Sequence, residues 1–227
     1  MLILAFDTSA AACSAALWRD GAVLSTGRVL MERGQAEALM PLIEGVMASG
    51  GATYADLDRI AVSVGPGSFT GVRVGLSAAR GLGLAADKAV VGVMTTEILA
   101  ASVGDAERQN AGDFAHILAA IDTKRGDLYV HQFDRSLRET GPVRAMALDD
   151  LAGWAAPGPL LVVGDGAAIA IANIGPRAVM SSADALPEPA VLARLAARRD
   201  PSPDGPVPVY VRLPEAVMPP YGGRLRP

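Results

Sequence analysis

The sequence predicts an α/β protein of two duplicated lobes, each a mixed β-sheet flanked by helices, with the second lobe reduced. The first observation is that residues 4–8 and 119–123 are both apolar strands that end in Asp-Thr and precede a turn and a further strand. They start 115 positions apart, about half of the 227-residue chain, which indicates an internal duplication. The second observation is that an apolar strand at 60–64, a Gly-rich loop at 65–71 and a helix at 72–86 follow one another.

The first lobe is predicted to span residues 1–104. Its strand candidates are the apolar runs 2–6, 11–19, 22–30 and 60–64. Asp20-Gly21 lies between the second and third of these runs, and Asp-Gly favours the tight turn that joins two antiparallel strands. The first lobe is therefore expected to open with a strand followed by a β-hairpin.

A helix is predicted over residues 35–48, before Gly50-Gly51. Its apolar residues recur at helical spacing over a broad face: Leu39, Met40, Leu42, Ile43, Val46 and Met47. Pro41 lies inside this run, and proline removes a helical hydrogen bond. The helix is therefore expected either to begin near Pro41 or to kink there.

The second lobe is predicted to span residues 113–212, after a polar boundary segment at 105–113. Its strand candidates are 115–121, 128–134, 141–147 and 160–163. A helix is predicted at 189–199, with proline in its first turn. Prolines crowd the chain from residue 201 onward, and residues 213–227 are predicted to form a flexible Pro-rich tail.

The loop at 65–71, Gly65-Pro66-Gly67-Ser68-Phe69-Thr70-Gly71, is the most distinctive segment of the chain. A Gly-rich turn before a helix presents backbone N–H groups to an anion or a carbonyl. The alternative is a tight turn whose glycines let the strand and the helix pack closely. The loop is not a Walker A motif, because no Lys-Ser/Thr pair closes it and Arg73 is the nearest cation.

Composition excludes several classes of protein. No uninterrupted apolar run reaches the roughly 18 residues that a membrane span needs, and no basic segment precedes the first strand as in a signal peptide. Cys13 is the only cysteine, so no internal disulfide is possible, which suits the cytoplasm. The net charge is −4, whereas a chain that binds RNA by itself usually has a basic face.

The Gly65–Gly71 string, followed by Val72-Arg73, closely resembles the signature of the TsaB (YeaZ) family. The resemblance extends over nearly the whole chain, through these further segments: residues 2–9, Ile121-Asp122-Thr123-Lys124-Arg125 with Tyr129, Gly164-Asp165-Gly166, and Pro208-Val209-Tyr210-Val211-Arg212. It implies the actin-like (ribonuclease H-like) fold of actin, sugar kinases and Hsp70. It also implies a role in forming threonylcarbamoyladenosine beside the tRNA anticodon.

In this fold the opening hairpin of each lobe faces nucleotide phosphates, so a vestigial nucleotide cleft is expected. Its candidate residues are Asp7, Gly65, Gly67, Ser68, Asp122, Gly164 and Gly166. In a working kinase-type site, the two carboxylates would hold Mg²⁺ through water or orient a nucleophile. Alternatively, each Asp caps its own turn. The alternative function is an ATP-dependent, sugar-kinase-like phosphotransferase that uses Asp7, Asp122 and the loop 164–166.

No catalytic residue, metal site or cofactor is predicted. The catalytic relative TsaD carries a His-x-x-x-His metal pair, whereas the corresponding region here, residues 31–39, has Gln35 and Glu37 but no histidine. His116 and His131 lie on predicted strands without the ligand spacing of a zinc site, and are predicted to be structural.

The resemblance implies a non-catalytic subunit that binds and activates a TsaD-like catalytic subunit, with a TsaE-like ATPase joining the assembly. It further implies a homodimer when the chain is alone, contact with tRNA only within the complex, and no membrane partner. Helix–helix contact is the expected mode, and the candidate interface positions are Leu39, Ile43, Met47, Val72, Leu76 and Arg80.

Overall fold

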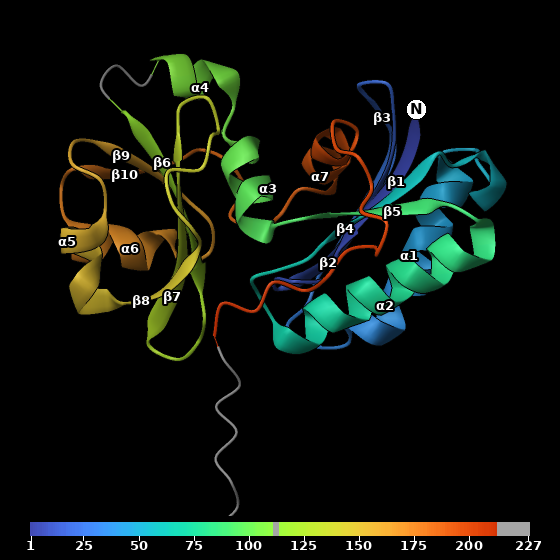
Figure 1. Cartoon of the computed structure of the whole chain (residues 1–227), viewed down its shortest axis with the longest axis horizontal. Helices are drawn as coiled ribbons and strands as arrows, with labels where there is room; N and C mark the ends of the chain where they lie inside the picture. Colours follow the sequence, from blue (N-terminus) through green and yellow to red (C-terminus); the bar gives the residue numbers. More distant parts are fainter. Residues whose placement is uncertain (111–113, 213–227) are drawn as a thin grey trace, which may run out of the picture.

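The structure is a computed structural model, and it describes residues 1–110 and 114–212. The tail predicted at 213–227 lies outside the described residues. The chain forms two five-stranded sheets, each with helices against it, and α3 (Thr95–Ser102) lies between them (Figure 1). The predicted α/β fold of two actin-like lobes with mixed sheets is confirmed.

The first sheet has the strand order β3-β2-β1-β4-β5. Its strands are β1 (Leu2–Asp7), β2 (Ala12–Arg19), β3 (Ala22–Leu30), β4 (Arg59–Ser63) and β5 (Ala89–Val93). β1, β2 and β3 pair antiparallel, and β1, β4 and β5 pair parallel. Asp20 and Gly21 both have positive φ, at 48° and 100°, which confirms the hairpin predicted between β2 and β3.

The second sheet repeats this order as β8-β7-β6-β9-β10. Its strands are β6 (His116–Asp122), β7 (Asp127–Asp134), β8 (Arg144–Ala147), β9 (Leu160–Val163) and β10 (Ala178–Met180). The pairing senses match those of the first sheet strand for strand. β1 and β6 therefore hold equivalent central places, as expected from a duplication.

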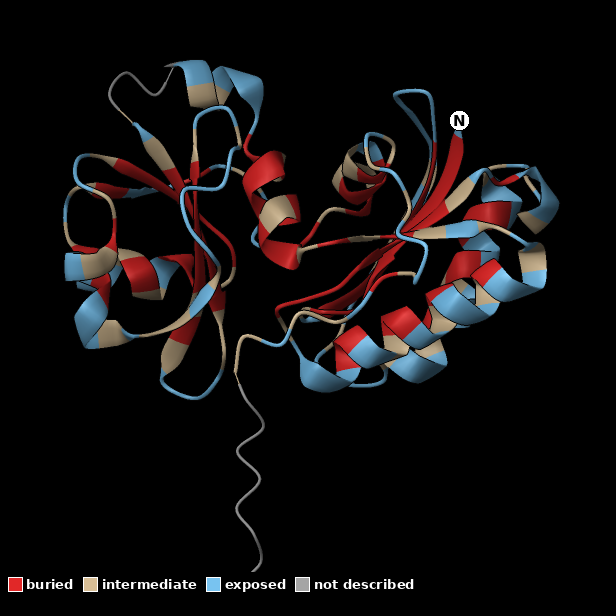
Figure 2. Cartoon of the chain, viewed as in Figure 1, coloured by how far each residue is buried: buried red, intermediate tan, exposed pale blue. Residues whose placement is uncertain are grey.

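Helices α1 (Gln35–Ser49) and α2 (Phe69–Ala86) cover one face of the first sheet. Each has buried residues toward the sheet and exposed residues on the outside (Figure 2). α1 begins at Gln35 and continues through Pro41, so the expectation that it begins near Pro41 is wrong. The inner residues of both helices join Leu4, Phe6 and their neighbours in one apolar core.

The chain returns to the first lobe after the second. The helix α7 (Pro189–Ala196), which lies within the range predicted for the second lobe, packs on the face of the first sheet opposite α1 and α2. There Leu192 contacts the cluster that contains Ile3 and Ala61. The following segment reaches Val64, whose carbonyl accepts a hydrogen bond from Val209 N at 2.8 Å.

The remaining helices are short. They are α4 (Asp105–Asn110), α5 (Leu151–Trp154), α6 (Ala167–Ile174) and the 3₁₀ turns η1 (Tyr54–Asp56) and η2 (Leu148–Asp150). α5 and α6 pack against the second sheet in a separate apolar core. Among the described residues, none of the helices is both long and apolar enough to cross a lipid bilayer.

Candidate functional site

The Gly-rich loop packs directly on the turn that follows β1. Ser68 N donates to the Ser9 carbonyl at 2.8 Å, and Thr8 Oγ1 donates to the Gly71 carbonyl at 2.7 Å. A Cβ at Gly67 or Gly71 would overlap the backbone oxygen of Ser9 or Thr8. Gly71 N in turn donates to Ser68 Oγ at 3.2 Å. These contacts support the close-packing interpretation of the loop, because its backbone already has partners in this chain.

Asp7 ends β1 and is buried. Its Oδ1 accepts from Ser9 Oγ at 2.6 Å and from Ser9 N at 3.2 Å, so Asp7 caps its own turn. Ser14 on β2 is the register partner of Asp7, and Ser63 ends β4 directly after Val62, the register partner of Phe6. Burial raises the pKa of the Asp7 carboxyl above its ordinary value of 3.8, an effect that the Ser63 and Ser9 hydroxyls oppose.

The second lobe repeats this arrangement with different partners. Lys124 N donates to Asp122 Oδ1 at 2.8 Å, and Lys124 Nζ lies 2.9 Å from Asp122 Oδ2. Burial acts to raise the pKa of Asp122, but its hydrogen bonds from Lys124 outweigh this and hold the pKa below its ordinary value. The loop at 164–166 packs on the end of β6, since Gly166 N donates to Ala120 O at 3.0 Å and a Cβ at Gly164 would overlap that oxygen.

The predicted cleft residues therefore group by lobe. Asp7 lies with the loop at 65–71, and Asp122 lies with the loop at 164–166. No hydrogen bond or ion pair within the described ranges joins Asp7 to Asp122. Within those ranges there is also no group of three or more His, Cys, Asp or Glu side chains that could hold a metal ion. A nucleotide role for these residues stays a prediction.

Because the Asp7 carboxyl is buried, we expect it to make the stability of the chain depend on pH. Because the folded pKa is raised, the folded chain binds the proton more tightly, so the contribution of Asp7 to stability falls as the pH rises above 3.8. The neutral variant Asp7→Asn should therefore be more stable than the parent at pH 7, by about 1 to 3 kcal/mol. This gain should shrink toward zero as the pH approaches 4, as measured by urea unfolding at a series of pH values.

Asp56 is the matched control, because its hydrogen bonds from Thr53 lower its pKa. Asp56→Asn should lose stability at pH 7, and that loss should vanish as the pH falls below about 4. An Asp7→Asn variant that is less stable than the parent at pH 7 would contradict the assignment of a destabilising buried charge.

The two histidines occupy the strands as predicted. His116 begins β6, and His131 lies on β7 and is fully buried, with its Nδ1 2.9 Å from Thr96 Oγ1 on α3. Burial lowers the pKa of His131 below its ordinary value, an effect that the nearby Glu139 opposes. His131 thus helps to join α3 to the second sheet.

Five of the six predicted interface side chains point into the core. Leu39, Ile43, Met47, Val72 and Leu76 are at most 4% exposed and belong to the apolar cluster beneath α1 and α2. The reason is that the apolar face of each helix covers the sheet, so an apolar pattern marks the inner side of the helix. Arg80 is exposed, and its Nη2 donates to Pro206 O at 2.7 Å.

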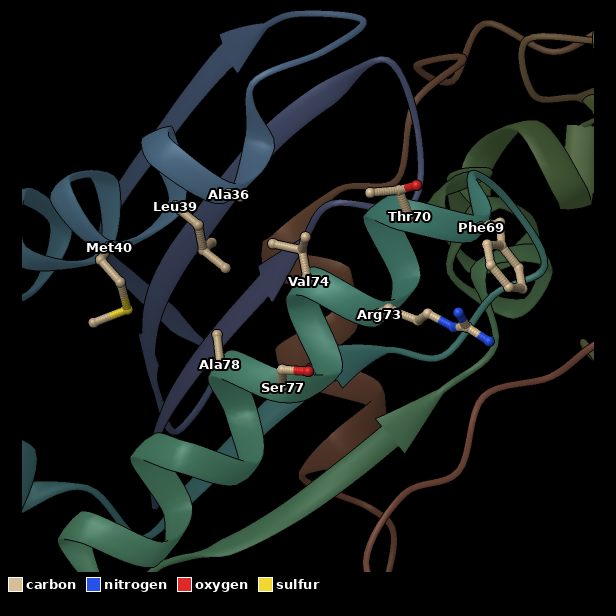
Figure 3. Close-up of a pocket in the computed structure, with 9 residues that line it drawn as sticks. All are labelled: Ala36, Leu39, Met40, Phe69, Thr70, Arg73, Val74, Ser77 and Ala78. Carbon is tan, nitrogen blue, oxygen red and sulfur yellow. The ribbon is translucent and has the colours of Figure 1, made fainter. Parts of the chain in front are cut away.

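Between the same two helices lies an open hollow of about 490 Å³, which reaches down to the buried Leu39 (Figure 3). It is lined by Ala36, Leu39, Met40, Phe69, Thr70, Arg73, Val74, Ser77 and Ala78. Most of these side chains are small or apolar. Neither the exposed Met40 nor the half-buried Val74 was among the predicted interface positions, although Met40 lies within the same apolar run as Leu39.

Charge is divided between the two helices beside the hollow. α1 carries exposed Glu37 and Glu44, which flank Met40 along the helix. α2 carries exposed Arg73 and Arg80, two turns apart on one side of that helix. We call the whole surface, with the hollow and these four charges, the α1/α2 face. An acidic ridge and a basic ridge on either side of an apolar hollow form a pattern that a complementary surface can match.

Comparison with known proteins identifies the family to which the sequence is similar. The family model described as "TsaD: tRNA N6-adenosine threonylcarbamoyltransferase" matches residues 29–172. The "tRNA threonylcarbamoyladenosine biosynthesis protein TsaB" of Escherichia coli (strain K12) is 38% identical over 135 residues, which are 60% of this chain and 56% of that protein. The match thus spans little more than half the length of that curated relative.

Solved structures resemble the chain over most of its length. "YeaZ from Pseudomonas aeruginosa" has a TM-score of 0.76 and 28% identity, and the match covers 92% of this chain and 99% of that one. The "Activator of the 2-Hydroxyisocaproyl-CoA Dehydratase from Clostridium difficile with bound ADPNP" has a TM-score of 0.50 at 9% identity, over 86% of this chain and 94% of that one. The second likeness concerns the fold alone.

Proposed function

This chain belongs to the TsaB/YeaZ branch of the TsaD-type family, and from that premise we propose that it acts in the biosynthesis of threonylcarbamoyladenosine on tRNA. Its part is that of a non-catalytic subunit, which binds and activates a TsaD-like catalytic chain. A TsaE-like ATPase joins the assembly, and the chain contacts tRNA only within this complex. The modification takes place in the cytoplasm. Alone, the chain pairs with a second copy of itself.

The observation that carries this proposal is the α1/α2 face. Its hollow is open and largely apolar, and it lies on the outside of two helices whose inner sides are already packed on the sheet. Exposed apolar area rimmed by charged side chains is typical of protein–protein contact sites. Two helices beside a hollow fit one or two helices of a partner, which pack in the groove between them.

The candidate cleft supports a role without phosphoryl transfer. Backbone groups of the loop at 65–71 already bond Thr8 and Ser9, and the Asp122 carboxylate is engaged by Lys124. After β10, which completes the second sheet, the described residues up to 212 run back to the first lobe through α7, so these residues do not build a further helical layer beside the loop at 164–166.

The test is reconstituted tRNA threonylcarbamoylation with the other pathway proteins of the same organism, with and without this chain. We expect modification to require the chain, and Asp7→Asn to support modification as well as the parent does. If modification proceeds equally well without the chain, the proposed function is wrong. Mg·ATP binding by the chain alone that disappears in Asp7→Asn would instead favour the phosphotransferase.

The α1/α2 face predicts where complex formation fails. Ser77 is exposed and lines the hollow, so Ser77→Glu should weaken binding of the TsaD-like chain by at least ~30-fold, because a charge must lose its water in an apolar contact. Ala172→Glu is the matched control, since it adds the same charge at an exposed position of α6 in the other lobe. Equal affinity of both variants would remove the α1/α2 face as the binding site.

A further inference from the structure

The C-terminal segment 206–212 lies beside α2 and reaches the α1/α2 face. Arg80 holds the segment through Pro206 O, and Val209 N bonds Val64 O just before the Gly-rich loop. Tyr210 then lies against Phe69, the first residue of α2, with ring centroids 5.7 Å apart. Two segments about 140 positions apart in the chain therefore meet at one end of the hollow.

Arg73 is held at this meeting point. Its guanidinium carbon lies 3.7 Å from the Phe69 ring centroid and 5.7 Å from the Tyr210 ring centroid, and its Nε donates to Tyr210 Oη at 3.0 Å. Phe69 is 57% exposed and Tyr210 is 50% exposed, so the cluster faces outward. Within residues 1–110 and 114–212, Nη1 and Nη2 of Arg73 have no hydrogen-bond partner. A planar guanidinium with its end donors unused is suited to a carboxylate, which it binds with two parallel hydrogen bonds.

We propose that a helix of the catalytic partner fills the hollow with apolar side chains and places a carboxylate on Arg73, with Tyr210 as the residue that positions the guanidinium. This inference rests on the proposed function. It makes the segment 206–212 a third element of the α1/α2 face, beside α1 and α2. Complementary charge supports this choice of ligand, because the acidic ridge of Glu37 and Glu44 disfavours a carboxylate on the other side of the hollow.

Exposed aromatic rings beside an arginine are also the chemistry that stacks on unpaired nucleobases. The chain has a net charge of −4, and Glu37 and Glu44 lie on the same face as the cluster. Both features repel a polyanion, whereas a helix with one carboxylate and an apolar stripe matches both the hollow and Arg73. A protein partner is therefore the occupant that the observations favour.

The experiment is the dissociation constant of the full chain with the TsaD-like catalytic chain, measured by calorimetry at two salt concentrations. Arg73→Glu should weaken binding by at least ~30-fold and reduce the salt dependence. It should change the melting temperature little, because Arg73 is exposed and substitutions of surface residues change the stability only slightly. Arg73→Lys should recover part of the affinity, and Tyr210→Phe should lose several-fold through the orientation of Arg73. Arg125→Glu, exposed on the second lobe, is the control and should bind as the parent does.

The outcomes separate this inference from the proposed function. If the parent chain does not bind the catalytic chain at all, the proposed function fails and the inference falls with it. If the parent binds, Ser77→Glu does not, and Arg73→Glu binds as the parent, the proposed function stands and the carboxylate contact is wrong. Two other results would also contradict the carboxylate contact, both with the affinity for the catalytic chain intact in Arg73→Glu. If this variant dissociates a homodimer, the cluster binds a second copy of the chain. If it releases tRNA from the complex, the cluster binds RNA.

Discussion

Gly71→Ala should destabilise the first lobe by about 3 kcal/mol or more. The added Cβ would overlap the Thr8 carbonyl oxygen, and because this is a backbone atom, no side-chain rotation can relieve the overlap. Relief requires α2 to move away from the β1–β2 turn, and that movement breaks the hydrogen bond from Thr8 Oγ1 to Gly71 O. The loss should appear in urea unfolding as a lower midpoint with an unchanged slope.

Gly81 on the same helix provides the control. Nothing lies within 4 Å of a Cβ at Gly81, so Gly81→Ala should raise the stability by about 0.5 to 1 kcal/mol through helix propensity alone. Trp18 lies in the first lobe and Trp154 in the second, so a Trp154→Phe background lets fluorescence follow the first lobe. If Gly71→Ala is as stable as Gly81→Ala, the loop has enough space for a Cβ at Gly71, and the predicted overlap with the Thr8 carbonyl oxygen is wrong.

Leu76→Glu should unfold the first lobe or cost it about 4 kcal/mol, because it buries a charge without a partner. Leu76 is 3% exposed within the core formed by α1, α2 and the sheet. Its neighbour Ser77 is exposed, and Ser77→Glu should change the stability by no more than about 0.5 kcal/mol. Circular dichroism melts of the two variants give the comparison directly.

This pair of variants separates folding from binding at adjacent positions. If Leu76→Glu does not form the partner complex, the reason is that the first lobe has unfolded. If Ser77→Glu does not form it, the reason is that the binding surface has been changed in a folded chain. Leu76 therefore cannot serve as a probe of the interface, although the family resemblance placed it among the candidates. Two variants of equal stability would mean that Leu76 is not a core residue.

Local sequence was sufficient for much of the fold. Asp20-Gly21 predicted the hairpin because two-residue turns depend on residues that accept positive φ, and both residues have it. The repeated Asp-Thr strand ends predicted the duplication, and the two sheets share one strand order. Each of these features depends on neighbours in the chain or on a repeat visible in it.

The candidate site was predicted less completely. The Asp7 and Asp122 turns and their glycine loops could be located from sequence, since each pairs an acidic strand end with a Gly-rich turn. The orientation of α1 and α2 could not, because Leu39 and Met40 look alike in an apolar run, and only packing on the sheet leaves Leu39 1% exposed and Met40 36% exposed. The helix over 189–196 was predicted as an element, but its place on the first sheet was not.

The sequence by itself thus determined the duplicated strand order, the tight turns and the loop whose glycines admit the carbonyl oxygens of Thr8 and Ser9. These follow from backbone preferences and periodicity, which act over a few residues. Only the tertiary structure decided which helix sides stay exposed, and that Tyr210 meets Phe69 and Arg73 at the end of the hollow. That meeting joins residues about 140 positions apart, and burial of the whole chain selects such contacts, which no local pattern encodes.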